Sequence, residues 1–145
     1  MTYYFAYGSN MNLSQMCWRC PGARMVGKGT LYGWRLVERQ HADIDRARGG
    51  KVQGVVWAVD ADHLVALDRY EGCPRYYIRV DARVNVKGRM VRCVAYEMTA
   101  EAKRRQQGMR FSPGYARACR EGAEENGVPV SRLFAARAKE DDDAI

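Results

Sequence analysis

The order of strand-forming and helix-forming segments most restricts what this chain can fold into. At least five strand-like runs occupy the first two thirds of the sequence: Thr2–Tyr7, two runs within Met25–Val37 broken at Gly33, Val52–Val59, and the pair Tyr76–Val86 and Met90–Met98. These runs are rich in β-branched and aromatic residues and are bounded by turn-forming residues. The clearest helix signals come later. Strands first and helices afterwards are typical of an α+β fold.

Two longer helices are predicted from their capping residues. Asp60 is an N-cap candidate, and Gly72 can supply the left-handed residue that ends this helix. The apolar residues expected to face inward are Leu64, Val65 and Leu67. Ser112-Pro113 predicts the start of another helix that runs to Asn126-Gly127, because serine caps helices and proline suits the first helical position.

The chain length of 145 residues fits one compact domain, which we place at residues 1–139. Residues 140–145 form an acidic C-terminal tail that holds four of the 17 acidic side chains. The 24 Lys and Arg residues and the remaining 13 acids give residues 1–139 a net charge of +11. Such a charge attracts anionic partners at long range, but it does not define the fold or the chemistry.

No run approaches the roughly 18 apolar residues that cross a bilayer, so no membrane partner is expected. The N-terminus lacks the pattern of a signal peptide, and we expect a cytoplasmic protein. The five cysteines are then predicted to be free thiols. His41 and His63 lie far from any cysteine in the sequence, and no metal site is predicted.

The turn formed by Tyr7, Gly8, Ser9 and Asn10 allows two interpretations. It follows a predicted strand and precedes a short helix, so backbone N–H groups there can point at a carboxylate or an oxyanion. Equally, Ser9 and Asn10 can be ordinary helix-capping residues in a tight turn. These residues alone leave both interpretations open.

Glu71 stands where the predicted helix ends. The negative end of the helix dipole, nearby Asp68 and the surrounding Leu67, Tyr70 and Tyr77 would each raise its pKa. A carboxyl group that titrates nearer neutrality can shuttle protons in catalysis. The alternative is a solvated glutamate at a helix end.

The segment 100–111 contains Lys103, Arg104, Arg105 and Arg110 and is predicted to be an exposed loop that touches ligand or remains solvated. Four tyrosines lie on the predicted hairpin or at the start of the late helix. These residues suit either the edge of the core or the wall of a pocket: Tyr76, Tyr77, Tyr96 and Tyr115.

A set of short motifs, in this order and spacing, resembles the γ-glutamylcyclotransferase family. The motifs extend over about residues 3 to 134: Tyr4-Phe5-Ala6-Tyr7-Gly8-Ser9-Asn10-Met11, Arg19-Cys20-Pro21, Gly54-Val55-Val56-Trp57, Leu67-Asp68-x-x-Glu71-Gly72, Tyr77-x-Arg79, Ser112-Pro113-Gly114-Tyr115 and Gly122-Ala123-x-Glu125-Asn126-Gly127. Each motif is weak alone, but the combination is specific.

The resemblance implies a small mixed β-barrel with flanking helices. It also implies release of 5-oxoproline from a γ-glutamyl amide by attack of the α-amine on the γ-carbonyl, without a metal or other cofactor. Glu71 would be the general acid and base. The residues implied to bind the γ-glutamyl group are Tyr7, Gly8, Ser9, Asn10 and Met11, and the matching pocket tyrosines are Tyr77 and Tyr115.

The expected partner is therefore a small γ-glutamyl compound, and the basic segment 100–111 favours an anionic or carrier-attached one. A nucleic-acid partner is not expected. One alternative is a non-catalytic protein that keeps the pocket and recruits an acidic partner through its positive charge. A third hypothesis, the weakest, is an amide hydrolase that pairs a cysteine with His41 or His63.

Overall fold

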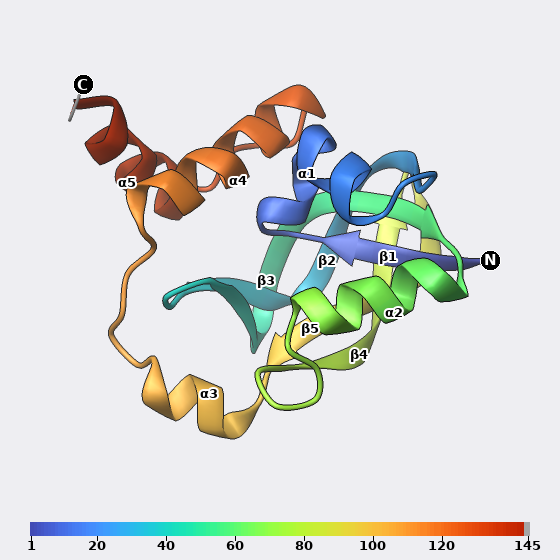
Figure 1. The fold of residues 1–145 in the computed structure, drawn as a ribbon, viewed down its shortest axis with the longest axis horizontal. Helices are drawn as coiled ribbons and strands as arrows, with labels where there is room; N and C mark the ends of the chain where they lie inside the picture. The colour runs from blue at the N-terminus through green and yellow to red at the C-terminus, as the bar shows by residue number, and fades with distance from the viewer. Residues whose placement is uncertain (144–145) are drawn as a thin grey trace.

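Five strands close into a barrel in the computed structural model, which describes residues 1–143 (Figure 1). The strands are β1 (Thr2–Ala6), β2 (Arg24–Glu38), β3 (Ala42–Val59), β4 (Tyr77–Val86) and β5 (Arg89–Met98). Their order around the barrel is β1-β3-β2-β4-β5. The β1 and β5 strands pair in parallel and the other neighbours pair antiparallel, which confirms the expected mixed barrel of the α+β class.

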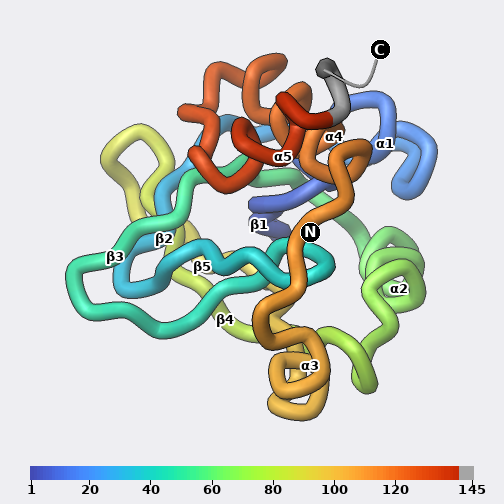
Figure 2. Tube along the Cα trace, turned by 90° about the vertical axis from the view of Figure 1, so that its left-hand side faces the viewer, coloured from blue at the N-terminus to red at the C-terminus, as the bar shows by residue number. Residues whose placement is uncertain are grey.

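The helices flank this barrel. They are the short 3-10 turn η1 (Ser9–Met11), α1 (Leu13–Arg19), α2 (Ala61–Tyr70), α3 (Ala100–Arg105), α4 (Pro113–Glu125) and α5 (Arg132–Asp143). Two perpendicular views show α4 and α5 together on one side of the barrel and α3 on the opposite side (Figures 1 and 2). Residues 140–143 of the predicted acidic tail continue α5, and residues 144–145 lie outside the described part.

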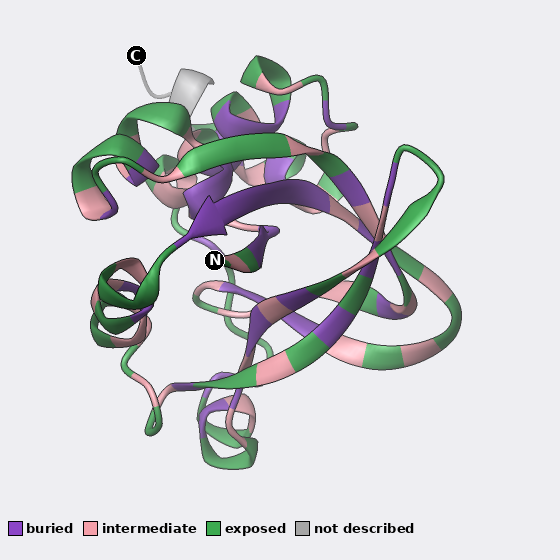
Figure 3. Ribbon diagram, turned by 90° about the vertical axis from the view of Figure 1, so that its right-hand side faces the viewer, coloured by how far each residue is buried: buried purple, intermediate pink, exposed green. Residues whose placement is uncertain are grey.

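The barrel interior is filled by apolar side chains from every strand. Phe5, Val55 and Val56 are completely buried, and most of β1 is enclosed (Figure 3). Gly54 faces this tightly packed strand, where an added Cβ would lie 2.4 Å from the Ala6 carbonyl oxygen. No larger residue fits there, so this glycine allows β3 to close against β1.

Strand lengths differ from the sequence prediction in the region of β2 and β3. Gly33 does not break β2 into two strands, because it adopts φ +85° at a β-bulge through which the pairing with β3 continues. The β3 strand begins at Ala42 instead of Val52, and its first half forms a long ribbon with the end of β2. The sequence pattern does not indicate a strand in this first half. Exposed polar residues interrupt it, so it lacks the continuous apolar run that is typical of a buried strand.

The predicted caps are confirmed, but one predicted detail of helix packing is wrong. Asp60 caps α2 and Ser112 caps α4 through side-chain hydrogen bonds, and Gly72 has φ +65°. Val65 is 56% exposed, however, while Leu64 and Leu67 are buried. Residues at positions i and i+3 share a helix face, and a residue at i+1 points about 100° away from the first.

The segment 100–111 is not simply an exposed loop. Its first half forms α3, capped by the Thr99 side chain, and Ala102 packs into the core. Lys103 Nζ contacts Asp45 Oδ1 at 2.5 Å and Glu97 Oε2 at 2.8 Å. This basic side chain therefore neutralises acids of the barrel.

Candidate active site

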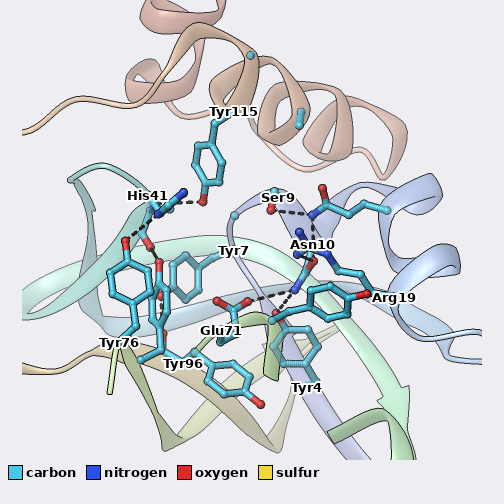
Figure 4. A pocket seen from close by; sticks show the side chains of 17 residues that line it. Tyr4, Tyr7, Ser9, Asn10, Arg19, His41, Glu71, Tyr76, Tyr96 and Tyr115 are labelled. Atoms are coloured by element: carbon cyan, nitrogen blue, oxygen red, sulfur yellow. Dashed lines mark hydrogen bonds between the residues drawn. The ribbon is translucent and has the colours of Figure 1, made fainter. Parts of the chain in front are cut away.

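A cavity of about 340 Å³ opens where β1 leads into η1. Seven tyrosines line it together with polar side chains from η1, α1 and the end of α2 (Figure 4). Those tyrosines are Tyr4, Tyr7, Tyr70, Tyr76, Tyr77, Tyr96 and Tyr115. The cavity is thus a single polar pocket with aromatic walls, large enough for a small molecule.

Nearly all of the residues predicted from the sequence meet in this cavity. Its lining includes Tyr7, Gly8, Ser9, Asn10, Glu71, Tyr77 and Tyr115. Met11 is the exception, because its side chain is 1% exposed and lies in the hydrophobic core. Its carbonyl oxygen accepts a hydrogen bond from Asn126 Nδ2 at 2.9 Å, so Met11 connects the η1 turn to α4.

The η1 turn contributes Ser9 and Asn10 to the cavity lining. The N–H groups of Met11 and Asn12 close the turn by donating to the carbonyl oxygens of Gly8 and Ser9. The preceding N–H groups are not used by the turn itself. Gly8 is required by close packing, because an added Cβ would lie 2.9 Å from Tyr115 Oη.

Glu71 lies at the end of α2, where its N–H donates to the Leu67 carbonyl oxygen. The surrounding protein desolvates its carboxyl group and raises the pKa to about 7, although the positive charge of Arg19 opposes this shift. Desolvation was among the predicted causes, but the predicted contribution of Asp68 is absent. Its carboxylate accepts hydrogen bonds from Arg79 Nη2 at 2.6 Å and Tyr96 Oη at 2.6 Å.

The Asn10 side chain connects Glu71 to the rest of the polar wall. Its Nδ2 donates to Tyr4 Oη at 3.0 Å and to Glu71 Oε1 at 3.3 Å. Its Oδ1 accepts from Gln15 Nε2 at 3.0 Å and from Arg19 Nη1 at 2.8 Å. These two donors fix the orientation of the amide, so the NH₂ group must face Glu71.

Arg19 is the cation of the cavity wall. Its guanidinium lies 4.7 Å from the centre of the Tyr70 ring and donates to the neutral Asn10 amide. It forms no ion pair with any acidic group among residues 1–140, the part of the chain whose side chains the structure describes. Its remaining donors can therefore meet an anion that enters the cavity.

Two tyrosines hold the start of β3 against the pocket. Tyr77 Oη donates to the Ala42 carbonyl oxygen at 2.6 Å, and the Ala42 N–H donates to Tyr115 Oη at 3.0 Å. Burial raises the pKa of both phenols well above the ordinary value, so neither phenol ionises near neutral pH. Next to Ala42, the half-buried His41 also lines the cavity.

Sequence reasoning missed several residues of this wall. Tyr4 and Arg19 occur in the motifs that carry the family resemblance, but no local pattern marks them as pocket residues. His41 was considered only as a metal ligand or as the partner of a cysteine. None of the cysteines described lines the cavity, and no group of three potential metal ligands occurs within residues 1–143.

The sequence left open whether the basic segment touches the ligand or remains solvated. No residue of 100–110 lines the cavity, and Arg105 pairs instead with Glu101 at 2.7 Å. None of the helices within residues 1–143 is long and apolar enough to cross a membrane.

Residues 4–115 match the family model described as Gamma-glutamyl cyclotransferase, AIG2-like. The chain belongs to this family. A γ-glutamylcyclotransferase from Bos taurus is 30% identical over 141 residues, covering 88% of this chain and 72% of the relative. The Mus musculus protein of the same name is 31% identical over 140 residues, covering 87% of this chain and 72% of the relative.

Solved structures agree with this assignment. A γ-glutamyl cyclotransferase structure superimposes with a TM-score of 0.77 at 26% identity and covers 95% of this chain and 85% of the relative. An uncharacterized protein from Homo sapiens gives a TM-score of 0.80 at 28% identity, with the same coverage of 95% and 85%. The chain is therefore homologous to γ-glutamylcyclotransferases over nearly all of its length.

Proposed function

We propose that this protein releases 5-oxoproline from a γ-glutamyl amide. The α-amine nitrogen of the substrate attacks the γ-carbonyl carbon, a new C–N bond closes a five-membered ring, and the original amide C–N bond breaks. Two protons pass from the α-ammonium nitrogen to the departing nitrogen, which leaves as an ammonium group. The reaction balances with the substrate alone.

The observation that carries this proposal is the position and pKa of Glu71. Its carboxyl lies in the cavity beside the η1 turn, and its pKa of about 7 lets both protonation states exist near neutral pH. The charged form can take a proton from the α-ammonium group, which makes the amine nucleophilic. The protonated form can then donate to the departing amine. One carboxyl group thus serves both steps.

Arg19 suits the α-carboxylate of the γ-glutamyl group. Asn10 separates this guanidinium from Glu71, with one hydrogen bond to each. An α-amino acid has its ammonium and carboxylate groups on one carbon atom, so it can reach Glu71 with the first group and Arg19 with the second. A γ-glutamyl chain that is held folded by its α-ammonium and α-carboxylate groups has already lost much of the conformational freedom that opposes ring closure.

With the α-carboxylate on Arg19, the backbone donors of the η1 turn are available for the γ-carbonyl oxygen. That oxygen gains negative charge when the amine attacks, and preorganised N–H groups stabilise such charge. In this arrangement Tyr7, Gly8, Ser9 and Asn10, which line the cavity, would surround the γ-glutamyl group. Tyr77 and Tyr115 form the opposite wall by holding the backbone of Ala42.

The test is a mass-spectrometric assay with γ-glutamyl amino acids, γ-glutamylamines and glutathione as substrates, in which 5-oxoproline and free glutamate are both measured. The wild type should release 5-oxoproline and Glu71→Gln should not. Glu101→Gln, a matched change of an exposed carboxylate outside the cavity, should remain active.

Other outcomes would contradict the proposal in different ways. Free glutamate in place of 5-oxoproline would indicate a hydrolase. No product from any substrate, together with retained binding of γ-glutamyl compounds, would favour the non-catalytic alternative. Normal turnover by Glu71→Gln would remove Glu71 from the mechanism.

A further inference from the structure

A chain of hydrogen bonds reaches the cavity from a backbone amide outside it. The Gln40 N–H donates to Gln106 Oε1 at 3.1 Å, and Gln106 Nε2 donates to Tyr76 Oη at 2.7 Å. Tyr76 Oη in turn lies 2.7 Å from His41 Nδ1. The chain links the turn before β3, the end of α3 and the start of β4 to one side of the pocket.

The backbone N–H at the start of this chain fixes the direction of the first two bonds. A backbone N–H can only donate, so the Gln106 atom that faces Gln40 must be the carbonyl oxygen. The Gln106 NH₂ group must then donate to Tyr76 Oη. That phenol has a single proton and, apart from His41 Nδ1, no acceptor for it among residues 1–140, so it donates to His41 Nδ1. A ring nitrogen that accepts carries no proton, so neutral His41 carries its proton on Nε2.

Solvent reaches the Nε2 atom of His41. This atom bonds to no group within residues 1–140, whose side chains the structure describes, and it is not among the buried polar atoms that lack a partner. His41 lines the pocket, and its ring lies 5.0 Å from that of Tyr115. His41 thus belongs to the side of the pocket formed by Tyr76 and Tyr115.

The two ends of the cavity differ in charge. Figure 4 shows His41, Tyr76 and Tyr115 on one side, Asn10 and Arg19 on the other, and Glu71 between them. A γ-glutamyl group with its α-carboxylate on Arg19 and its α-ammonium on Glu71 extends its γ-carbonyl toward His41. A neutral donor suits this carbonyl oxygen, because it does not have to give up a proton there.

We propose that His41 is a further catalytic residue, whose Nε2–H donates to the γ-carbonyl oxygen and stabilises the negative charge formed when the α-amine attacks. Gln106 and Tyr76 are positioning residues that fix the required tautomer. This inference rests on the proposed function. Burial lowers the pKa of His41, which keeps the ring neutral in the range where Glu71 titrates.

The tautomer itself is tested without any substrate. Two-bond ¹H–¹⁵N correlation spectra of the wild type should show a protonated Nε2 and an unprotonated Nδ1 for His41 at neutral pH. A protonated Nδ1, or a charged ring, would overturn the inference whether or not the protein is an enzyme.

The role in catalysis is tested by His41→Phe and by Gln106→Glu. Loss of one oxyanion donor typically lowers kcat about 10²-fold or more, and we expect His41→Phe to do so with little change in KM. Gln106→Glu keeps the acceptor for the Gln40 N–H but replaces the NH₂ donor by an acceptor. Tyr76 would then donate to Glu and accept from His41 Nδ1, which removes the proton from Nε2.

Gln106→Glu should therefore lower kcat and exchange the two nitrogen signals of His41, although residue 106 does not line the cavity. In a Tyr76→Phe background, where the relay is cut, the same change should cause no further loss. Normal kcat in folded His41→Phe, or in Gln106→Glu with an exchanged tautomer, would overturn the role of His41. Absence of 5-oxoproline from the wild type would instead refute the proposed function.

Discussion

Replacing Glu71 by glutamine should stabilise the fold at alkaline pH. Its pKa rises from 4.5 to about 7 on folding, and each pKa unit corresponds to about 1.4 kcal/mol, so the penalty of the charged form is about 3 kcal/mol. Below pH 4.5 the carboxyl is neutral in both the folded and the unfolded chain, and the penalty is absent. Between 4.5 and 7 the folded chain binds more protons, so stability falls as pH rises.

The assay is urea unfolding of the wild type and Glu71→Gln across this pH range. The difference in the free energy of unfolding should grow with pH in favour of the variant and level off above about pH 7 at up to about 3 kcal/mol. Glutamine keeps an acceptor for Asn10 Nδ2, so that hydrogen bond survives. The exposed control Glu101→Gln should show no such growth. A pH-independent difference for Glu71→Gln would refute the argument that desolvation sets its pKa.

Three further predictions concern the site and its support. The rate constant kcat/KM should rise as pH passes through about 7, because Glu71 must be charged to accept the first proton, and a flat profile there would contradict this. Arg19→Gln should raise KM about 10- to 100-fold for γ-glutamyl substrates but not for analogues with an α-carboxamide, as measured by steady-state kinetics. Gly122→Ala should destabilise the fold by about 1–3 kcal/mol in urea unfolding, because the new Cβ would lie 2.5 Å from the Asn12 backbone nitrogen. Gly114→Ala in the same helix has no atom within 4 Å of its Cβ and should be neutral or stabilising.

Local sequence determined where most elements begin and end. Capping side chains and left-handed glycines act within a few residues, so Asp60, Gly72 and Ser112 could be recognised without the fold. The early half of β3 and the helix α3 could not, because their apolar contacts come from distant segments. Ala102 is buried only because α3 packs on the barrel.

The motif combination in the sequence also identified Glu71 and the η1 turn as parts of one site. The sequence predicted that apolar and aromatic neighbours raise the pKa of Glu71, but it wrongly added Asp68, whose carboxylate is held by Arg79 and Tyr96. The sequence also did not predict that Arg19 lies at the cavity, or which nitrogen of His41 we infer to carry the proton. Arg19 is held at the cavity by Asn10 and Tyr70. The hydrogen bonds around His41 join residues far apart in the chain, such as Gln106 and Tyr76. These contacts, and the extent to which Glu71 is desolvated, arise only when the barrel closes, so the tertiary structure decided them.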